Sequence, residues 1–328
     1  MVFFGIIGFC FLLYHLVYLV VVRFLDCDIK LFFYDKFGNS VDTLCGKVVW
    51  ITGASSGIGE HLAYTLAKGG CKIILSARRE VELDKVKSNC LTANPNLQDH
   101  DVQVLVFDVR SIGSHERIFD NAMSIFGRLD ILVNNAGRSQ RAVWEDIDIA
   151  VDKEAFDLNT FSVVSLSRLA IKQFNRQGSG HVAVTSSLAG ILGVPFSASY
   201  TGSKHAIHGY FDCLRMEKMN QNIAVTLVCP GPIQTDFLAE SFTENVGEKY
   251  GKQTEIASNK LSAARCAKLF GSALANRLDE VWIGHATSLQ LTYAVKYYPN
   301  LSSFFMPFVG ASVIQKIRDS KVTVTVQE

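Results

Sequence analysis

The chain has 328 residues, and its 32 lysines and arginines nearly balance 31 aspartates and glutamates, so the formal net charge at pH 7 is +1. Proteins that bind nucleic acid usually carry a basic excess, and this balance argues against that class of partner. Almost half of the residues, 48%, are hydrophobic and only 6 are proline. This composition excludes a disordered chain and supplies enough apolar residues for a large buried core.

The N-terminus predicts a membrane anchor. Residues 2–22 contain no Asp, Glu, Lys or Arg, and His15 is their most polar member. An α-helix of that length spans about 31 Å at about 1.5 Å per residue, close to the hydrocarbon thickness of a bilayer. A cleavable signal peptide is the main alternative, but it would show a basic start, a shorter apolar run and a small-residue cleavage site. We therefore expect a single-pass transmembrane anchor over residues 1–24 and a linker over residues 25–44.

From residue 45 onward, apolar segments alternate with amphipathic ones. Strands are expected over residues 47–52, 72–76, 102–107, 131–133, 181–185, 223–228 and 281–283, and helices over residues 60–68, 80–90 and 114–126. The expected strands are nearly continuously apolar, which is typical of parallel strands buried on both faces. Strands that alternate with helices predict a doubly wound parallel sheet. We expect residues 45–285 to form one Rossmann-like α/β domain with about seven strands.

A glycine-rich turn follows the first expected strand and reads Thr52-Gly-Ala-Ser-Ser-Gly-Ile-Gly59. Between a strand and a helix, such glycines permit a tight turn, close approach of the backbone to a pyrophosphate, and packing of the helix on the sheet. The helix N-terminus adds free N–H groups and the positive end of the helix dipole. An ordinary turn would show the same glycines, so the strand–turn–helix context favours the nucleotide. The predicted contacts are Gly53, Ser55, Ser56, Gly57, Ile58 and Gly59.

The end of the second expected strand bears on which dinucleotide binds. An NAD-selective site often places an acid there for the ribose hydroxyls, but this chain reads Ser76-Ala-Arg-Arg-Glu80. Arg78 and Arg79 could neutralise a 2′-phosphate through charged hydrogen bonds. The alternative is that both arginines are solvated charges beside Glu80 and Glu82. We expect NADP(H) in preference to NAD(H).

Tyr200 and Lys204 are one helical turn apart and therefore on one helix face. A lysine ammonium close to a phenol favours the phenolate and lowers the tyrosine pKa from about 10. Such a tyrosine can give a proton to a carbonyl or take one from an alcohol. The same spacing recurs at Tyr64 and Lys68, but only Tyr200 has a serine, Ser187, thirteen residues earlier at a strand end. A hydroxyl at that place can donate to a substrate oxygen.

With these motifs the chain resembles the short-chain dehydrogenase/reductase family of the Tyr-x-x-x-Lys type. The family pattern also matches Asp108 after the third strand, Asn134-Asn-Ala-Gly137, Asn159 and Pro230-Gly231, in the family's order. The resemblance covers roughly residues 45–285. It implies transfer of a hydride between a nicotinamide cofactor and a carbonyl or alcohol.

The resemblance also implies a role for each matching residue. Tyr200 would be the acid/base, and Ser187 would bind the substrate oxygen. Lys204 would bind the nicotinamide ribose and tune Tyr200, and Asn159 would hold a water in the proton relay. Other cofactor contacts would come from Asp108 at the adenine, from Ile233 and Thr235 at the nicotinamide amide, and from Asn135, Ala136 and Gly137.

A closer resemblance is to a membrane-bound subgroup of this family. It is carried by the apolar N-terminus and by Ser76-Ala-Arg-Arg79, Gly137-Arg-Ser-Gln-Arg141, Lys204-His-Ala206 and Cys229-Pro-Gly-Pro232. That subgroup is known from the endoplasmic reticulum and acts on retinoids and steroids with NADP(H). The resemblance thus implies a membrane location there and a lipophilic carbonyl or alcohol as substrate.

Two further segments bear on the substrate. Residues 236–261 are polar, with glycines at 247 and 251, and form either a mobile lid over the site or an ordinary surface loop. Residues 286–328 form an apolar, aromatic-rich extension. Packing in the core or in a homodimer accounts for it, and an apolar substrate channel or a patch at the bilayer interface is the alternative.

The remaining alternatives concern the class of protein. No Cys-x-x-Cys pair stands among the eight cysteines, so no metal site is expected. A membrane-tethered nucleotide-binding scaffold without turnover would have lost part of the catalytic set, which is intact here. Together, these features predict an NADP(H)-dependent oxidoreductase.

Overall fold

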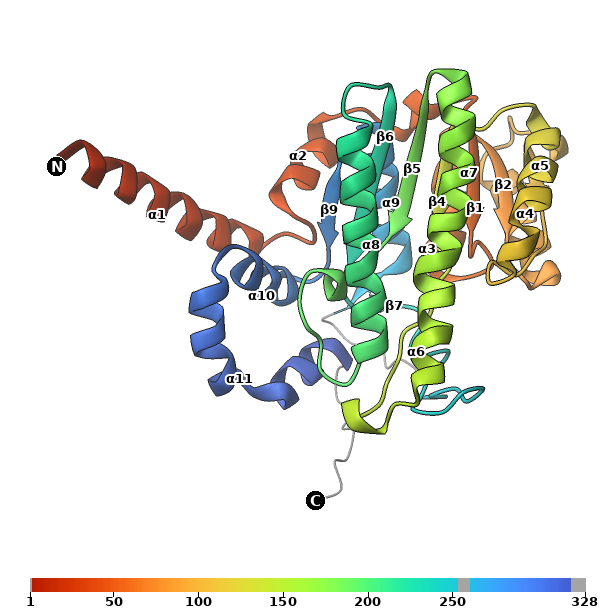
Figure 1. Ribbon diagram of the computed structural model, residues 1–328. Helices are drawn as coiled ribbons and strands as arrows, with labels where there is room; N and C mark the ends of the chain where they lie inside the picture. The colour runs from red at the N-terminus through yellow and green to blue at the C-terminus, as the bar shows by residue number, and fades with distance from the viewer. Residues whose placement is uncertain (1, 253–259, 320–328) are drawn as a thin grey trace.

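The computed structural model describes residues 2–252 and 260–319, and a seven-stranded sheet lies at its centre (Figure 1). Its spatial order is β3-β2-β1-β4-β5-β6-β9, and every neighbouring pair is parallel. The strands are β1 (Val48–Thr52), β2 (Lys72–Ser76), β3 (Val102–Val104), β4 (Ile131–Asn134), β5 (Gly180–Thr185), β6 (Ile223–Pro230) and β9 (Glu280–Ile283). The predicted fold is confirmed, with β3 three residues shorter than expected.

Helices cover both faces of the sheet. One layer holds α3 (Gly57–Lys68), α4 (Glu80–Ala93) and α9 (Ala263–Ala275), and the other holds α5 (His115–Phe126), α7 (Ser162–Gln177) and α8 (Ala198–Glu217). Because side chains alternate along a strand, Trp50 of β1 packs in the second layer, with its ring 5.8 Å from that of Phe119, while Val49 and Ile51 pack in the first. Each face of the sheet therefore has its own apolar core.

The strand order reverses direction between β1 and β4. From β1 the chain proceeds outward to β2 and β3, and from β4 it proceeds the other way. The connections that leave the carboxyl ends of these two central strands diverge there and open a crevice, which is where open α/β sheets bind ligands. The glycine-rich turn and Asn135 both lie at this edge.

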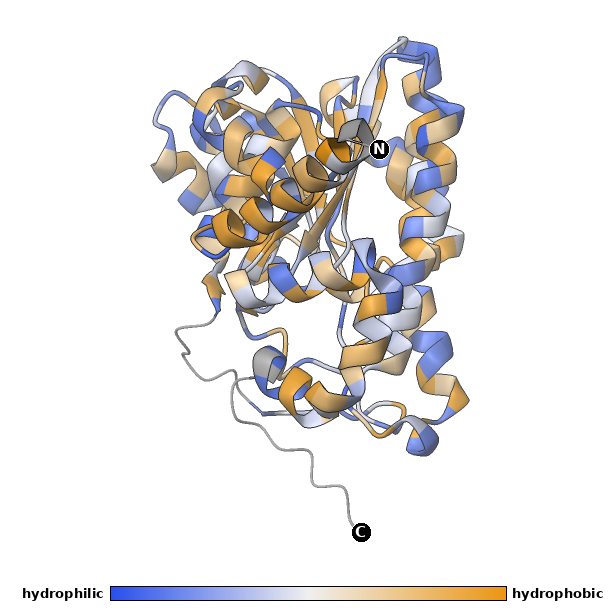
Figure 2. Cartoon of the chain, turned by 90° about the vertical axis from the view of Figure 1, so that its left-hand side faces the viewer, coloured by the Kyte–Doolittle hydropathy of each residue, from blue (hydrophilic) through white to orange (hydrophobic). Residues whose placement is uncertain are grey.

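The N-terminal helix α1 (Val2–Val22) extends away from the sheet, and apolar residues run along its length (Figures 1 and 2). Its segment Gly5–Val22 is long and apolar enough to cross a membrane, and almost none of it is buried. Its end near the domain does find partners, and Val22 is buried in the core there. His15 Nδ1 lies 2.6 Å from the hydroxyl of Tyr293, and the Tyr18 ring stacks on Tyr293 at 4.0 Å.

Residues 25–44, which we expect to be a linker, fold onto the domain instead. They contain α2 (Ile29–Phe37) and a 3₁₀ turn over Val41–Leu44. Arg265 of α9 binds Asp26 at 2.7 Å and Asp35 at 3.0 Å, and the Asp28 carboxylate accepts a hydrogen bond from the backbone of Trp282 at 2.6 Å. These acids pair with groups from distant parts of the chain, and the pairing holds the segment in place.

The C-terminal extension consists of α10 (Ala286–Tyr297) and α11 (Pro299–Asp319), with a break in α11 at Gly310, whose φ is +72°. Leu289 and Tyr293 of α10 are buried in the core, whereas Phe304, Phe305 and Phe308 of α11 are exposed. The extension therefore packs on the domain through α10 and through the end of α11, where Ile314 is buried, and it exposes an apolar surface in the first half of α11.

Candidate active site

A cavity of about 760 Å³ opens at the carboxyl edge of the sheet. All the predicted site residues line it except Gly59 and Asn159. These two lie directly behind its wall, Gly59 against the Gly53 carbonyl and Asn159 against the backbone of Arg138. The structure thus brings the whole predicted set to one place.

The glycine-rich turn needs its glycines for two separate reasons. Gly53 and Gly57 have φ of +65° and +61°, in the left-handed region that favours glycine. Gly59 is required by packing, because a Cβ there would lie 2.3 Å from the Gly53 carbonyl oxygen and 2.5 Å from Asn135 Nδ2. The first turn of α3 can therefore sit directly on the loop.

Asn135 ties the ends of three strands together. Its Nδ2 donates to the carbonyl oxygens of Thr52 at 3.3 Å and Gly53 at 3.1 Å, after β1. Its Oδ1 accepts from the hydroxyl of Thr185, at the end of β5, at 3.0 Å. This side chain fixes the floor of the cavity, which fits the position that the family pattern gives it.

The loop fits an anionic ligand. Within the described part of the chain, Ser56 precedes α3 without capping it through its side chain, so N–H groups of the first turn remain available for an acceptor. Arg79 donates to the hydroxyls of Ser55 at 3.0 Å and Ser56 at 2.9 Å. A guanidinium therefore lies beside the free end of the helix, and both favour a phosphate.

Asp108 forms another part of the cavity wall. Burial would raise the pKa of its carboxyl, but hydrogen bonds from the backbone N–H and the guanidinium of Arg110, at 2.9 Å and 3.2 Å, outweigh burial and lower it. Arg78 lies 3.9 Å away on the other side. Asp108 is thus an ionised acceptor at the place where the adenine contact is predicted.

The predicted catalytic groups meet at the opposite end. Tyr200 and Lys204 project from α8, and Tyr200 lines the same cavity as Ser187, whose hydroxyl donates to Pro230 O at 3.2 Å. The Lys204 ammonium donates to the Thr185 carbonyl oxygen at 2.7 Å and lies 5.8 Å from the centre of the Tyr200 ring. Ser187 Oγ accepts from Ala189 N at 3.1 Å, which fixes the hydroxyl in the wall.

The pKa of Tyr200 differs from the expectation. Burial raises it, and the hydrogen bond from Ser187 and the charge of Arg141 only partly oppose burial. Burial also lowers the pKa of Lys204 to about 8. The spacing predicts a phenolate favoured by the ammonium, but the ammonium is engaged by Thr185 and both charged forms are penalised by the low-dielectric surroundings. Tyr200 therefore holds its proton at neutral pH.

Asn159 lies in a π-helical turn, Asp157–Phe161, where the chain passes from α6 (Ile149–Phe156) into α7. Such turns are frequent at functional sites. Its Oδ1 accepts from Arg138 N at 3.0 Å, and its Nδ2 donates to Arg138 O at 2.9 Å and to Ser203 Oγ at 3.1 Å. It therefore holds the backbone beside Gly137, and its part in a water relay stays a prediction.

Two arginines of the cavity have no role that the sequence pattern predicts. Arg141 is buried and donates to Gln140 O at 2.8 Å and Ser197 Oγ at 2.9 Å. Arg318, in the last turn of α11, donates to Pro195 O at 2.6 Å and to the same Ser197 hydroxyl at 2.8 Å. Arg141 belongs to the motif of residues 137–141 that carries the subgroup resemblance, and this is the only feature of the sequence that points to it. No feature of the sequence points to Arg318.

The segment expected to be a lid is only partly described. Phe242 is buried, its N–H donates to Ser139 O at 2.9 Å, and its carbonyl accepts from Arg141 N at 2.8 Å. Residues 233–234 (β7) pair with residues 261–262 (β8). Residues 253–259 lie outside the described residues, and the lid stays a prediction.

Comparison with known proteins agrees with this geometry. A sequence model of the short chain dehydrogenases matches residues 47–246. The human protein named Dehydrogenase/reductase SDR family member 7 is 38% identical over 313 residues, which cover 94% of this chain and 91% of that protein. Its mouse counterpart is 37% identical over 320 residues, covering 96% and 93%.

Solved structures share the fold. A levodione reductase has a TM-score of 0.66 at 26% identity and covers 75% of this chain and 98% of its own. An alcohol dehydrogenase from the archaeon Thermococcus sibiricus, complexed with 5-hydroxy-NADP, has a TM-score of 0.63 at 23% identity, covering 73% and 96%. The part of this chain that these structures leave unmatched is therefore about a quarter of its length.

Proposed function

The chain belongs to the short-chain dehydrogenase/reductase family of NAD(P)-dependent oxidoreductases, and we propose that it passes a hydride between NADP(H) and a lipophilic carbonyl or alcohol of the retinoid or steroid type. The observation that carries this proposal is the composition of the cavity next to Tyr200. Leu192, Val194, Leu291 and Ile314 line the same cavity as the catalytic hydroxyl. Apolar walls favour a substrate with an extended apolar body.

The choice of NADP(H) rests on the arginine pair. The second strand ends at Ser76 with no acid beside it, and Arg78 and Arg79 both line the cavity. The hydrogen bonds of Arg79 to Ser55 and Ser56 hold its charge at the turn. An additional phosphate on the adenine ribose would gain from this positive charge, whereas NAD(H) would not.

The side chains divide the chemistry between them. The bound dinucleotide supplies or accepts the hydride. Tyr200 gives the proton at its Oη to the substrate oxygen during reduction and takes one from the alcohol during oxidation. Ser187 donates to the same oxygen and stabilises the negative charge that develops there. Lys204, held by Thr185, offsets the charge of the phenolate once the proton has left.

We also place the enzyme on the membrane of the endoplasmic reticulum as a single-pass protein. The exposed apolar length of α1 supports an anchor. Phe304, Phe305 and Phe308 are exposed on α11, the same helix whose Ile314 lines the cavity, and add a second apolar surface. A substrate that partitions into lipid would meet the cavity from this side.

The experiment that tests the substrate class uses purified full-length protein in detergent. Oxidation of NADPH is followed by its absorbance against a panel of retinals, ketosteroids and small quinones. We expect kcat/KM to rise with the apolar length of the carbonyl compound. Turnover confined to the small quinones would contradict the lipophilic substrate.

A further inference from the structure

Helix α8 carries a third polar residue in line with Tyr200 and Lys204. His208 is one further turn along, on the same helix face. The three side chains contact three successive residues, the last residue of β5 and the two that follow it. Lys204 binds the carbonyl of Thr185, His208 Nε2 lies 3.0 Å from Ser186 Oγ, and Tyr200 lies close enough to Ser187 for the Ser187 hydroxyl to lower its pKa.

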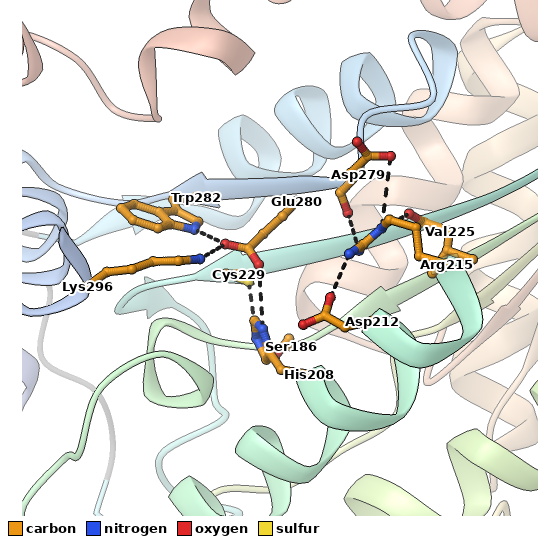
Figure 3. Close-up of polar contacts among 10 residues, drawn as sticks. All are labelled: Ser186, His208, Asp212, Arg215, Val225, Cys229, Asp279, Glu280, Trp282 and Lys296. Atoms are coloured by element: carbon orange, nitrogen blue, oxygen red, sulfur yellow. Dashed lines mark hydrogen bonds and ion pairs between the residues drawn. The ribbon is translucent and has the colours of Figure 1, made fainter. Parts of the chain in front are cut away.

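Glu280 of β9 holds the other side of the imidazole. Its Oε2 lies 3.5 Å from His208 Nδ1, and its Oε1 accepts from Lys296 Nζ at 2.6 Å and Trp282 Nε1 at 2.8 Å. Figure 3 shows the carboxylate between His208 on one side and Lys296 with Trp282 on the other. Burial opposes ionisation, but these hydrogen bonds lower the pKa of Glu280 to about 2. The imidazole is thus bonded at both ring nitrogens.

The contact between His208 and Ser186 is enclosed. A Cβ on Gly190 would lie 2.8 Å from both the imidazole Nε2 and the Ser186 hydroxyl, so the chain passes over the pair without a side chain. The order serine, histidine, glutamate is that of a hydrolytic triad. Ser186, however, is only 2% exposed beneath this turn. The arrangement therefore suits a structural contact that holds Ser186 in place rather than a nucleophilic Ser186.

We propose that His208, oriented by Glu280, is a positioning residue for Ser187. Ser187 has extended backbone angles, φ −167° and ψ 161°, and successive side chains of an extended segment point to opposite sides. The side chains of Ser186 and Ser187 therefore point to opposite sides of the backbone. A hydrogen bond that holds the Ser186 side chain in place also restricts the direction of the Ser187 side chain. This inference rests on the proposed function and concerns the same reaction.

The docking of α8 itself does not depend on His208. Arg215, two turns further along, donates to the carbonyl oxygens of Asp279 at 2.9 Å and Val225 at 3.4 Å (Figure 3). The backbone of Ser186 also donates to Val228 O at 2.7 Å. The helix and the strand end thus remain attached when the imidazole is removed. The loss then acts on Ser186 and, through the backbone, on Ser187, whose hydroxyl is otherwise held by Ala189 N at 3.1 Å and Pro230 O at 3.2 Å.

Two substitutions of His208 separate its two bonds. Gln places an amide near the position of Nε2 and keeps the contact with Ser186, whereas Asn places one near Nδ1 and keeps the contact with Glu280 only. In full-length protein we expect His208→Asn to lower kcat about 10- to 100-fold, since a misplacement of about 1 Å can cost that much. His208→Gln should stay within a few-fold of wild type. Neither should change KM for NADPH.

Two controls lie on the same helix. His205 is exposed and bonds only to its own turn, so His205→Asn should leave kcat unchanged. Arg215→Ala removes the bonds of α8 to Val225 of β6 and to Asp279, which precedes β9, without touching Ser186. It should lower the melting temperature more than kcat. Equal losses of kcat in His208→Asn and His208→Gln, or a wild-type kcat in His208→Asn, would overturn the proposal.

A second readout separates this inference from the proposed function. The Ser187 hydroxyl lowers the pKa of Tyr200, so misdirecting Ser187 should raise that pKa. The pKa is obtained from the difference in ultraviolet tyrosinate titration between each protein and the same protein carrying Tyr200→Phe. A raised pKa in His208→Asn but not in His208→Gln supports the positioning role even if no carbonyl compound in the panel is reduced. An unchanged pKa in both would contradict it.

Discussion

The ammonium of Lys204 donates to the carbonyl oxygen of Thr185 at 2.7 Å, and this bond holds a positive charge 5.8 Å from the centre of the Tyr200 ring. The lysine is therefore near the phenol, but its ammonium is bonded to a backbone carbonyl oxygen. Because the ammonium is engaged by Thr185, burial can dominate the pKa of Tyr200. This arrangement also assigns separate consequences to the loss of the phenol and to the loss of the ammonium.

Removing the phenolic hydroxyl tests the acid/base role. Tyr200→Phe should lower kcat by at least about 10²- to 10⁴-fold, the usual contribution of a positioned acid. The Kd for NADPH, measured from the quenching of tryptophan fluorescence, should stay within about two-fold, because the ring and its packing against Phe237 at 6.1 Å are kept. A near-normal kcat would remove Tyr200 from the mechanism.

The pH dependence of reduction should report the lysine. Because burial lowers the pKa of Lys204 to about 8, its charge is present below that pH and lost as the pH rises through it. Tyr200, with a raised pKa, keeps its proton over the same range. We expect kcat/KM for carbonyl reduction to fall above about pH 8.

The matched variant for this profile is Lys204→Arg, whose guanidinium stays charged over the whole range. Its rates should be lower than those of the wild type, but the alkaline decline near pH 8 should be absent. If the decline remains in Lys204→Arg, another group causes it.

The sequence was sufficient where function and fold depend on local pattern. The turn of residues 52–59 is recognisable because its glycines are demanded by backbone angles and by the contact of Gly59 with Gly53, both of which act over a few residues. The buried strands are recognisable because parallel strands are apolar throughout. Among the strands, β3 ended early, although Leu105 N and Phe107 N still bond to the second strand and its extension.

Features that depend on distant partners were not predictable. The helix over Ile29–Phe37 is held by Arg265 and Trp282, more than two hundred residues away, and its own composition reads as a linker. The spacing of Tyr200, Lys204 and His208 on one helix face can be read from the sequence. The contact of His208 with Glu280, seventy-two residues further along the chain, cannot. The raised pKa of Tyr200 arises from burial, which residue spacing does not reveal.

Coenzyme preference should follow the two arginines. Arg79→Ala removes the charge held at Ser55 and Ser56, and a lost charged hydrogen bond costs about 1.5–3 kcal/mol. We therefore expect KM for NADPH to rise about 10- to 100-fold while KM for NADH changes little. Lys85→Ala, which breaks an exposed ion pair with Glu82 on α4, is the control and should change neither. An equal rise for both coenzymes would show that the arginine serves the shared pyrophosphate.

The proposed anchor can be tested without disturbing the domain, because the exposed side of α1 is separate from its contact with α10. Leu12 and Leu16 are 68% and 61% exposed, whereas His15 and Tyr18 contact Tyr293. Wild-type protein should remain in the membrane pellet after extraction with alkaline carbonate. Replacing Leu12 and Leu16 together by Arg adds about 2.5–3.5 kcal/mol per residue to the cost of insertion near the helix centre, and should move the protein to the supernatant.

Leu12→Ala with Leu16→Ala keeps the helix apolar and should stay in the pellet. Release of the wild-type protein by carbonate would contradict an integral anchor and leave α1 as a surface-bound helix.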